Sequence, residues 1–271
     1  KWTPRLTAAR TRKSPGGTGT RTEHLRPFYQ TDLFRWAIIA ELIACHLIPA
    51  SIRGILATVS AQQLLKKDAN NRYSDASKTR PIGKCERPLA DVLRGDASAV
   101  ARAIGRLLIN FGQYAVSIQS GGEAVSRALQ TRLQADITTV TVFTDASNAY
   151  CMLDTADELR ALDILIQYIK NLDTTRIPIG NTKNELLWAC DLLIADLTFY
   201  RAHDGAVLTV IDGILARFDL PGGEVQGGLW SMLRFTITVA MLVIQELAIT
   251  YPVTYTHIRA HETLLAPVCR L

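Results

Sequence analysis

Hydrophobic residues recur at helical spacing through much of the first half of the chain. The pattern predicts a helical segment over Thr31 to Val59, with Asp32 as its N-cap. Two more helices are expected over Ser98 to Ile118 and Gly121 to Gln134, where apolar residues return every three or four positions. The polar, basic stretch Gln62 to Pro88 is expected to be a loop. The first half is therefore predicted to be all-α.

After Ala135 the apolar residues form shorter runs. Runs that are β-branched or extended in character are expected at Ile137 to Phe143, Ala161 to Lys170, Thr174 to Gly180, Ala206 to Asp212 and Val253 to Ile258. Helices are expected over Asn184 to Tyr200, with Asn184 or Thr182 as cap, and over Ser231 to Thr250. This order suits an α/β fold with one central mixed sheet and helices on its faces.

The distribution of charge divides the chain at a similar place. The formal net charge is +5, but residues up to Gln130 include 20 basic and 9 acidic side chains, a balance of +11. The remaining 141 residues carry 10 basic and 16 acidic side chains, a balance of −6. We therefore expect the N-terminal half to bind a polyanion such as nucleic acid, and we expect residues 1–30 to be a flexible basic arm. A uniformly basic packing protein is excluded.

The cysteines and the long apolar stretches limit the environment. Five cysteines are scattered without a CxxC pair, which argues against a zinc site or a disulfide framework and favours a reducing, intracellular compartment. The apolar stretches Phe34 to Val59 and Met232 to Val253 are both interrupted by charged residues. We therefore expect buried helices and no membrane span.

Three carboxylates stand at the ends of the predicted elements after Ala135. Asp145 follows the first strand, Glu185 opens a helix and Asp212 ends a later strand. Such positions face a common crevice in a mixed sheet, and converging carboxylates with oxygen-only ligation suit Mg²⁺ or Mn²⁺. Taken singly, Asp145 and Asp212 also suit turns, and Glu185 suits a helix capping box.

Taken in order, TVTVFTDAS, TKNELLWACDLLIADL, AVLTVID and VTYTHIRAH resemble the ribonuclease H family over roughly residues 137–265. The last motif ends Arg259, Ala260, His261, which is similar to the basic residue, small residue and His that follow the family's last strand. The helical segment Ala103 to Leu133 resembles, more faintly, the connection region of retrotransposon reverse transcriptases. The resemblance divides the chain into 1–30, a basic arm; 31–134, a helical basic region; and 135–271, a ribonuclease H-like domain with a five-stranded mixed sheet.

The resemblance implies two-metal hydrolysis of the RNA strand of an RNA–DNA hybrid by a reverse-transcriptase-associated endonuclease. In that reading Asp145 bridges both ions, and Glu185 and Asp212 each hold one. His261 assists proton transfer or product release. The basic N-terminal half would then follow the phosphates of the hybrid.

The chain departs from the family pattern in two places. It has no glycine between Asp145 and Gly180, where the family has a glycine-rich second strand, and the family's fourth carboxylate is replaced at best by Glu262. A degenerate ribonuclease H-like module that binds nucleic acid or acts as a scaffold is therefore the alternative. A helical interaction protein with a merely solvated acidic half is the third possibility.

Overall fold

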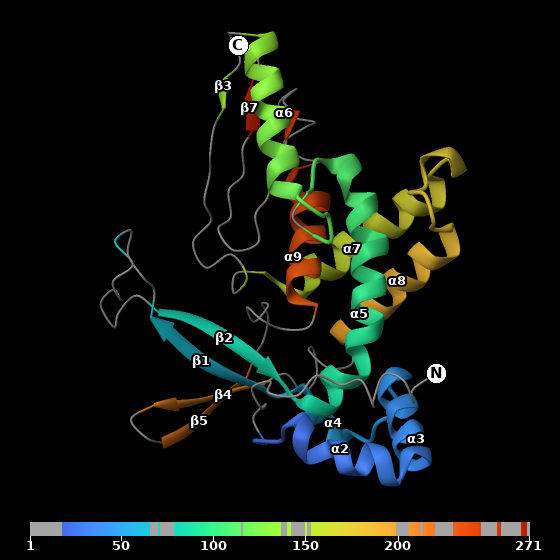
Figure 1. Ribbon diagram of the computed structural model, residues 1–271, viewed down its shortest axis with the longest axis vertical. Helices are drawn as coiled ribbons and strands as arrows, with labels where there is room; N and C mark the ends of the chain where they lie inside the picture. The colour runs from blue at the N-terminus through green and yellow to red at the C-terminus, as the bar shows by residue number, and fades with distance from the viewer. Residues whose placement is uncertain are drawn as a thin grey trace. The chain divides into compact units, whose positions relative to one another are not determined.

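The computed structural model is mixed α/β and mostly helical (Figure 1). It describes residues 18–65, 70, 79–114, 116–136, 140–141, 150, 153–198, 206–211, 214–219, 230–244, 254–255 and 267–269. The chain divides into two compact units. Unit 1 comprises Lys1–Ala97 and Ala195–Ser231, and unit 2 comprises Ser98–Ile194 and Met232–Leu271. Each unit contains residues from both sides of position 135. The division of the chain into regions 1–30, 31–134 and 135–271 is not tested by these units and stays a prediction.

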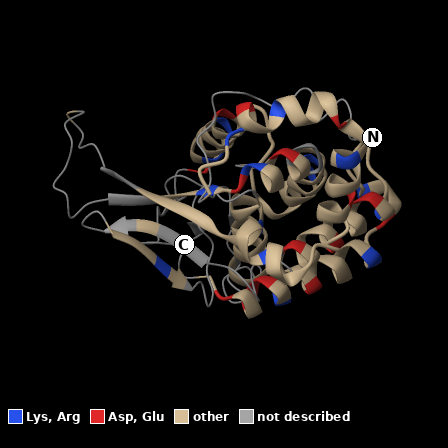
Figure 2. Ribbon diagram, turned by 90° about the horizontal axis from the view of Figure 1, so that it is seen from below, with Lys and Arg blue, Asp and Glu red and all other residues tan. Residues whose placement is uncertain are grey.

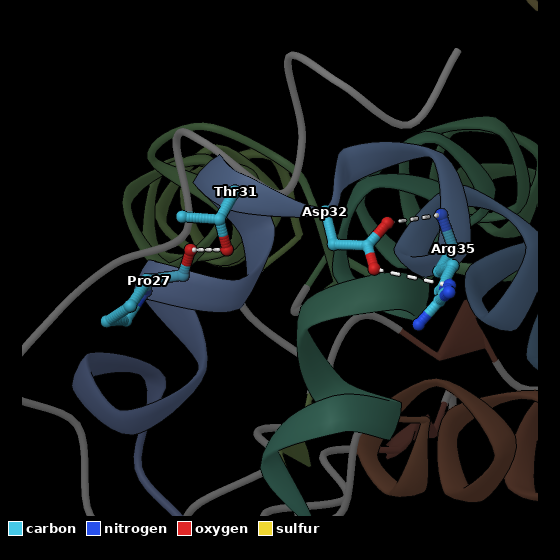
Figure 3. Close-up of polar contacts among 4 residues, drawn as sticks. All are labelled: Pro27, Thr31, Asp32 and Arg35. Carbon is cyan, nitrogen blue, oxygen red and sulfur yellow. Dashed lines mark hydrogen bonds and ion pairs between the residues drawn. The ribbon is translucent and has the colours of Figure 1, made fainter.

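Unit 1 begins with three short helices: α2 (Thr22–Thr31), α3 (Leu33–Ala44) and α4 (Ala50–Ala57). Asp32 is confirmed as the N-cap of α3. Its Oδ1 accepts a hydrogen bond from the backbone N–H of Arg35 at 3.5 Å, and its Oδ2 lies 3.3 Å from Arg35 Nε (Figure 3). Pro49 stands between α3 and α4 as the N-cap of α4, so the single helical segment expected over Thr31 to Val59 is two helices. The expectation of a flexible arm was wrong for α2.

The core of unit 1 lies under these helices. Its buried hydrophobic residues are Leu25, Tyr29, Ala40, Ile43, Ile48, Leu56, Ala57, Leu89, Val92 and Leu93. The rings of Tyr29 and Trp36 meet edge to face, with centroids 5.0 Å apart. Residues 89–93 belong to α5 (Arg87–Leu108), so the first part of this long helix closes the core against α2 and α3.

Unit 1 also holds a four-stranded sheet in the order β2-β1-β4-β5. Its strands are β1 (Val59–Leu65), β2 (Thr79–Cys85), β4 (Ala206–Ile211) and β5 (Ile214–Asp219). The β1–β2 and β4–β5 pairs are antiparallel, and β1–β4 is parallel. Two predictions were wrong here: the loop, over residues 62–65 and 79–85, and the all-α first half. A seven-residue backbone ladder joins β1 to β2, and such a ladder needs no apolar pattern. The expected strand at Ala206 is confirmed as β4.

Unit 2 contains the rest of α5 and most of the remaining elements. These are the 3₁₀ turn Ile109–Phe111, α6 (Gly121–Ala135), α7 (Thr155–Asn171), the 3₁₀ turn Thr174–Arg176, α8 (Lys183–Asp196), α9 (Ser231–Thr238) and the π-helical turn Val239–Ile244. A small sheet in the order β3-β7-β6 is formed by β3 (Val140–Thr141), β6 (Thr254–Tyr255) and β7 (Pro267–Cys269). Helices α6 and α8 confirm their predictions. The helix expected over Ser98 to Ile118 is confirmed only as far as Leu108, because α5 begins at Arg87 and ends there. Within the described ranges, no helix is long and apolar enough to cross a membrane.

Two predicted strands were wrong. Ala161 to Lys170 lies inside α7, where Ala161, Leu162, Leu165 and Ile169 are buried. Their spacing of one, four and eight residues is helical, and Asp154 caps the helix by accepting a hydrogen bond from Ala156 N–H at 2.9 Å. Thr174 to Gly180 begins as a 3₁₀ turn, with Asp173 accepting from Thr175 N–H at 3.0 Å. The described sheets therefore have four and three strands, and no five-stranded sheet is found in the described parts of the chain.

Helix α9 is buried over nearly its whole length, and it carries a charge. Arg234 and Glu158 of α7 are both 1% exposed, and Arg234 Nε lies 3.3 Å from Glu158 Oε2. Because a charged group loses its hydration on burial, each of these side chains requires the other in the folded state. The pair therefore fixes α9 against α7.

We predict that Glu158→Gln lowers the free energy of unfolding by about 3–5 kcal/mol, because it removes one charge of a buried ion pair. Urea denaturation followed by circular dichroism measures this loss. The control is Asp157→Asn, which changes the neighbouring but exposed acid of the same helix. Equal stability of the two variants would contradict a structural role for the pair.

Gly105 of α5 is a point of close approach. A Cβ there would lie 2.4 Å from the carbonyl oxygen of Val116, whereas a Cβ at Gly122 of α6 would meet nothing within 4 Å. We predict that Gly105→Ala destabilises the protein by about 1–3 kcal/mol through this clash. Gly122→Ala should instead stabilise it by roughly 0.5–1 kcal/mol, because alanine is the better helix former. Thermal melts of the two variants should shift in opposite directions.

Candidate functional site

Glu185 is the one predicted site residue that the structure describes. It lies in the first turn of α8 with its side chain exposed. Its Oε2 accepts hydrogen bonds from the backbone N–H of Thr182 at 2.7 Å and from Thr182 Oγ1 at 3.1 Å. The backbone N–H of Glu185 donates to Thr182 Oγ1 at 3.2 Å. The two residues therefore form a reciprocal capping box, which selects Thr182 over Asn184 as the cap.

The capping box leaves one carboxylate oxygen available. Both side-chain bonds of Glu185 use Oε2, and Oε1 makes no hydrogen bond with any residue that the structure describes. The Oε2 bonds hold the carboxylate in one orientation at the positive end of the helix dipole. A single oxygen that is held in place and exposed to solvent is a suitable monodentate ligand for a hard cation.

Asp212 falls outside the described residues, but its two neighbouring strands do not. Ile211 is the last residue of β4 and pairs with Ile214, the first residue of β5. The two residues between them are Asp212 and Gly213, a dipeptide typical of two-residue hairpin turns. Strand β4 thus leads directly into β5. The Asp-Gly pair was the sequence signal for this hairpin, and it was missed.

Asp145 and His261 also fall outside the described residues. The nearest described strands before them are β3 and β6, which are joined through β7. Strand β4, which precedes Asp212, belongs to the other sheet and pairs with β1 and β5. The described strands before Asp145 and before Asp212 are therefore not partners in one sheet. In the described ranges no group of three or more His, Cys, Asp or Glu side chains is placed to hold a metal ion.

Two buried carboxylates at the start of α5 were missed by the sequence patterns. Glu86 accepts hydrogen bonds from Thr18 N–H at 2.8 Å and Thr18 Oγ1 at 2.7 Å. Asp91 accepts from Thr22 Oγ1 at 3.0 Å and pairs with the buried guanidinium of Arg87. These contacts hold the beginning of α2 on α5 within unit 1. The segment before Thr18 carries Lys1, Arg5, Arg10, Arg12 and Lys13, so this basic segment is joined to a point that the core holds in place.

Three described arginines of the basic half have partners close by in the chain. Arg35 pairs with Asp32, Arg127 with Glu123, and Arg102 donates to Ser98 Oγ. Figure 2 shows basic and acidic segments mixed along the helices. Exposed ion pairs such as Arg35–Asp32 and Arg127–Glu123 contribute only about 0–1 kcal/mol each to stability.

Cys190 of α8 is excluded as a nucleophile. It is buried, and its burial raises the pKa of the thiol to about 12, with a smaller contribution from Asp191. The thiol is therefore protonated at neutral pH and serves the apolar core.

Comparisons with known proteins identify no family. No family model matches the chain, and no curated protein matches it. Among solved structures, it is similar to an apo telomerase from Candida tropicalis that is truncated from its C-terminal domain, with 11% sequence identity and a TM-score of 0.43. The match covers 87% of this chain and 49% of that chain, so this chain spans about half the length of the telomerase. A likeness at this level carries no information on function.

We predict that Thr182→Ala lowers the free energy of unfolding by about 1 kcal/mol, because it removes the capping hydroxyl from the start of α8. Glu185→Gln should cost less, since a glutamine at this position also completes a capping box. Chemical denaturation of both variants measures the difference. The opposite ranking would show that the charge of Glu185, and not its hydrogen bonds, stabilises the helix.

Proposed function

We propose that this chain hydrolyses the RNA strand of RNA–DNA hybrids as a ribonuclease H-like endonuclease of the kind associated with retrotransposon reverse transcriptases. Asp145, Glu185 and Asp212 are the proposed metal ligands, and His261 is the proposed residue for proton transfer or product release. The N-terminal half is proposed to contact the phosphates of the hybrid through its excess of basic residues.

One observation supports this proposal above the others: Glu185 opens α8, and the next described strand, β4, ends at the residue before Asp212. This is the order of elements that the family resemblance requires around its second and third carboxylates. The exposed Oε1 of Glu185 adds to this support. The hydrogen bonds of the capping box already hold this carboxylate in one orientation, so less side-chain entropy would be lost when a metal ion binds.

The proposed ions are Mg²⁺ or Mn²⁺, and Glu185 is the described residue that supports this choice. Glu185 offers a hard oxygen donor on an exposed helix start, which is the ligand type these ions prefer. A bound pair of such ions would supply an activated water and stabilise the leaving 3′ oxygen of the cleaved strand. The chain's own contribution would be to orient the carboxylates and hold the hybrid.

A second candidate is a non-catalytic module that binds nucleic acid or acts as a scaffold. Two observations favour it. Glu185 already has a structural role as a capping-box acid, and the Asp212–Gly213 dipeptide occupies the two-residue connection between β4 and β5. A residue kept for its cap or its turn remains in the sequence after a catalytic site has been lost.

The first candidate predicts Mg²⁺-dependent cleavage of the RNA strand of a labelled RNA–DNA hybrid by the full 271-residue chain. Asp145→Asn should reduce the rate at least about a hundredfold, because loss of a metal-ligand charge removes transition-state stabilisation. Glu185→Gln should also abolish cleavage while its capping box and stability are kept. The matched control is Asp163→Asn on the exposed face of α7, which should cleave at the unmodified rate.

The same experiment separates the two candidates. Binding of the hybrid is measured in EDTA by fluorescence anisotropy at two salt concentrations. A folded chain that binds the hybrid with strong salt dependence but cleaves nothing with Mg²⁺ or Mn²⁺ would contradict the enzyme and support the binding module. A folded chain that neither binds nor cleaves the hybrid would contradict the enzyme and the nucleic-acid-binding module, and only the scaffold role would be left.

A further inference from the structure

The connection between α7 and α8 presents an isoleucine to solvent on a closed turn (Figure 1). Ile179 is 95% exposed, the largest exposed fraction of any described large hydrophobic side chain. The backbone N–H of Asn181 closes the turn by donating to the carbonyl oxygen of Pro178 at 3.0 Å. Gly180 has a φ of +83°, the left-handed conformation that the third position of a type II turn requires. Ile179 therefore stands at the tip of a defined β-turn.

Side chains on either side of this turn hold it in place within unit 2. Arg106 of α5 donates a hydrogen bond from Nη1 to the carbonyl oxygen of Ile179 at 3.1 Å. Lys183 Nζ donates to the carbonyl oxygen of Lys170 at 2.9 Å, which joins the start of α8 to the end of α7. A turn that is already ordered loses little further freedom when its tip enters a partner. The isoleucine is thus pre-organised for binding.

The turn lies on a cationic part of unit 2. Arg106 adds a fourth cation to the three cations and two carboxylates of residues 170–185, which are Lys170, Arg176 and Lys183, and Asp173 and Glu185. Among the described residues, no carboxylate forms an ion pair with Arg106 or Lys183. The residues after Gln130 have a charge balance of −6, so this cationic surface differs from the half of the chain to which the turn belongs.

An apolar tip among cations fits a nucleic-acid duplex better than it fits other partners. Helices that bind membrane surfaces insert a broad apolar face, and protein interfaces exclude charge from their apolar centre. Proteins that distort a duplex insert single side chains such as isoleucine, leucine or proline between base steps, and they use arginine and lysine beside them. The phosphates of the duplex also complement the excess of positive charge.

We propose that Ile179 is a wedge that enters an RNA–DNA hybrid at a base step, while Arg106 and Lys183 contact the flanking phosphates. This inference rests on the proposed function and adds how the hybrid is held. An A-form duplex has a wide, shallow minor groove, which admits a β-turn that carries one isoleucine. Because Ile179 precedes Glu185 by six residues, the wedge would position the hybrid beside a proposed metal ligand.

The apolar and the charged contacts are separated by measuring hybrid binding in EDTA over a range of salt concentrations with fluorescence anisotropy. Ile179→Ala should weaken binding about tenfold or more at every salt concentration, without changing the slope of log affinity against log salt. Arg106→Gln and Lys183→Gln should each reduce that slope by about 1, because each loses one phosphate contact while glutamine still donates to the same carbonyl oxygen. The matched controls Ile214→Ala, which is also exposed, and Arg160→Gln on α7 should change neither quantity.

Insertion itself is tested with hybrids that carry 2-aminopurine at successive positions of the DNA strand, because the fluorescence of this base rises when it is unstacked. The unmodified chain should raise the fluorescence, and Ile179→Ala at saturating concentration should not. If the unmodified chain binds the hybrid but Ile179→Ala binds equally well, or if no position becomes brighter, the wedge is overturned and the proposed function stands.

The remaining outcomes concern the proposed function. Binding and unstacking without cleavage would reject the enzyme and keep the wedge. An unmodified chain that is folded but does not bind the hybrid would overturn both. Circular dichroism verifies that each variant is folded, which the exposure of Ile179 and Arg106 favours.

Discussion

A charged side chain that is buried on folding needs a partner of opposite charge. Each of the two units of this protein contains a buried ion pair of this kind. In unit 1, the buried carboxylate of Asp91 pairs with the guanidinium of Arg87 and accepts a hydrogen bond from the hydroxyl of Thr22. The carboxylate of Glu86 accepts a hydrogen bond from the hydroxyl of Thr18. In unit 2, Glu158 receives Arg234 from a helix that is buried along its length. The Thr22–Asp91, Thr18–Glu86 and Glu158–Arg234 contacts join segments distant in the chain, so they hold helices in positions that helix propensity alone would not determine.

The described residue of the candidate site differs from these buried, long-range pairs in both respects. Glu185 is exposed, and its partner, Thr182, is only three residues away. A local capping box holds the carboxylate without burying it, so the same side chain can serve the helix through one oxygen and a cation through the other. A capping role and the proposed metal-binding role therefore predict the same residue at the same position. The two roles differ in what they require of Asp145, which the capping box does not need.

The sequence by itself determined the elements whose signals are local. The apolar repeat identified α5, α6 and α8, the β-branched run identified β4, and Asp32 was recognisable as a cap. The Thr182-to-Glu185 spacing predicted a capping box, and Asp212–Gly213 carried an unread hairpin signal. These signals suffice because a cap, a turn or an amphipathic face depends on residues within one or two helical turns.

Only the tertiary structure decided the rest. Residues 161–170 became a helix because the whole of α7 supplies the cap and buried face that a ten-residue window lacks. The polar segments of β1 and β2 became strands because they pair with each other, and their pattern contains no trace of that pairing. The assignment of β3 and β4 to different sheets is likewise a matter of long-range pairing. Such contacts join residues far apart in the chain, so the free energy that they contribute cannot be predicted from the sequence of any single segment.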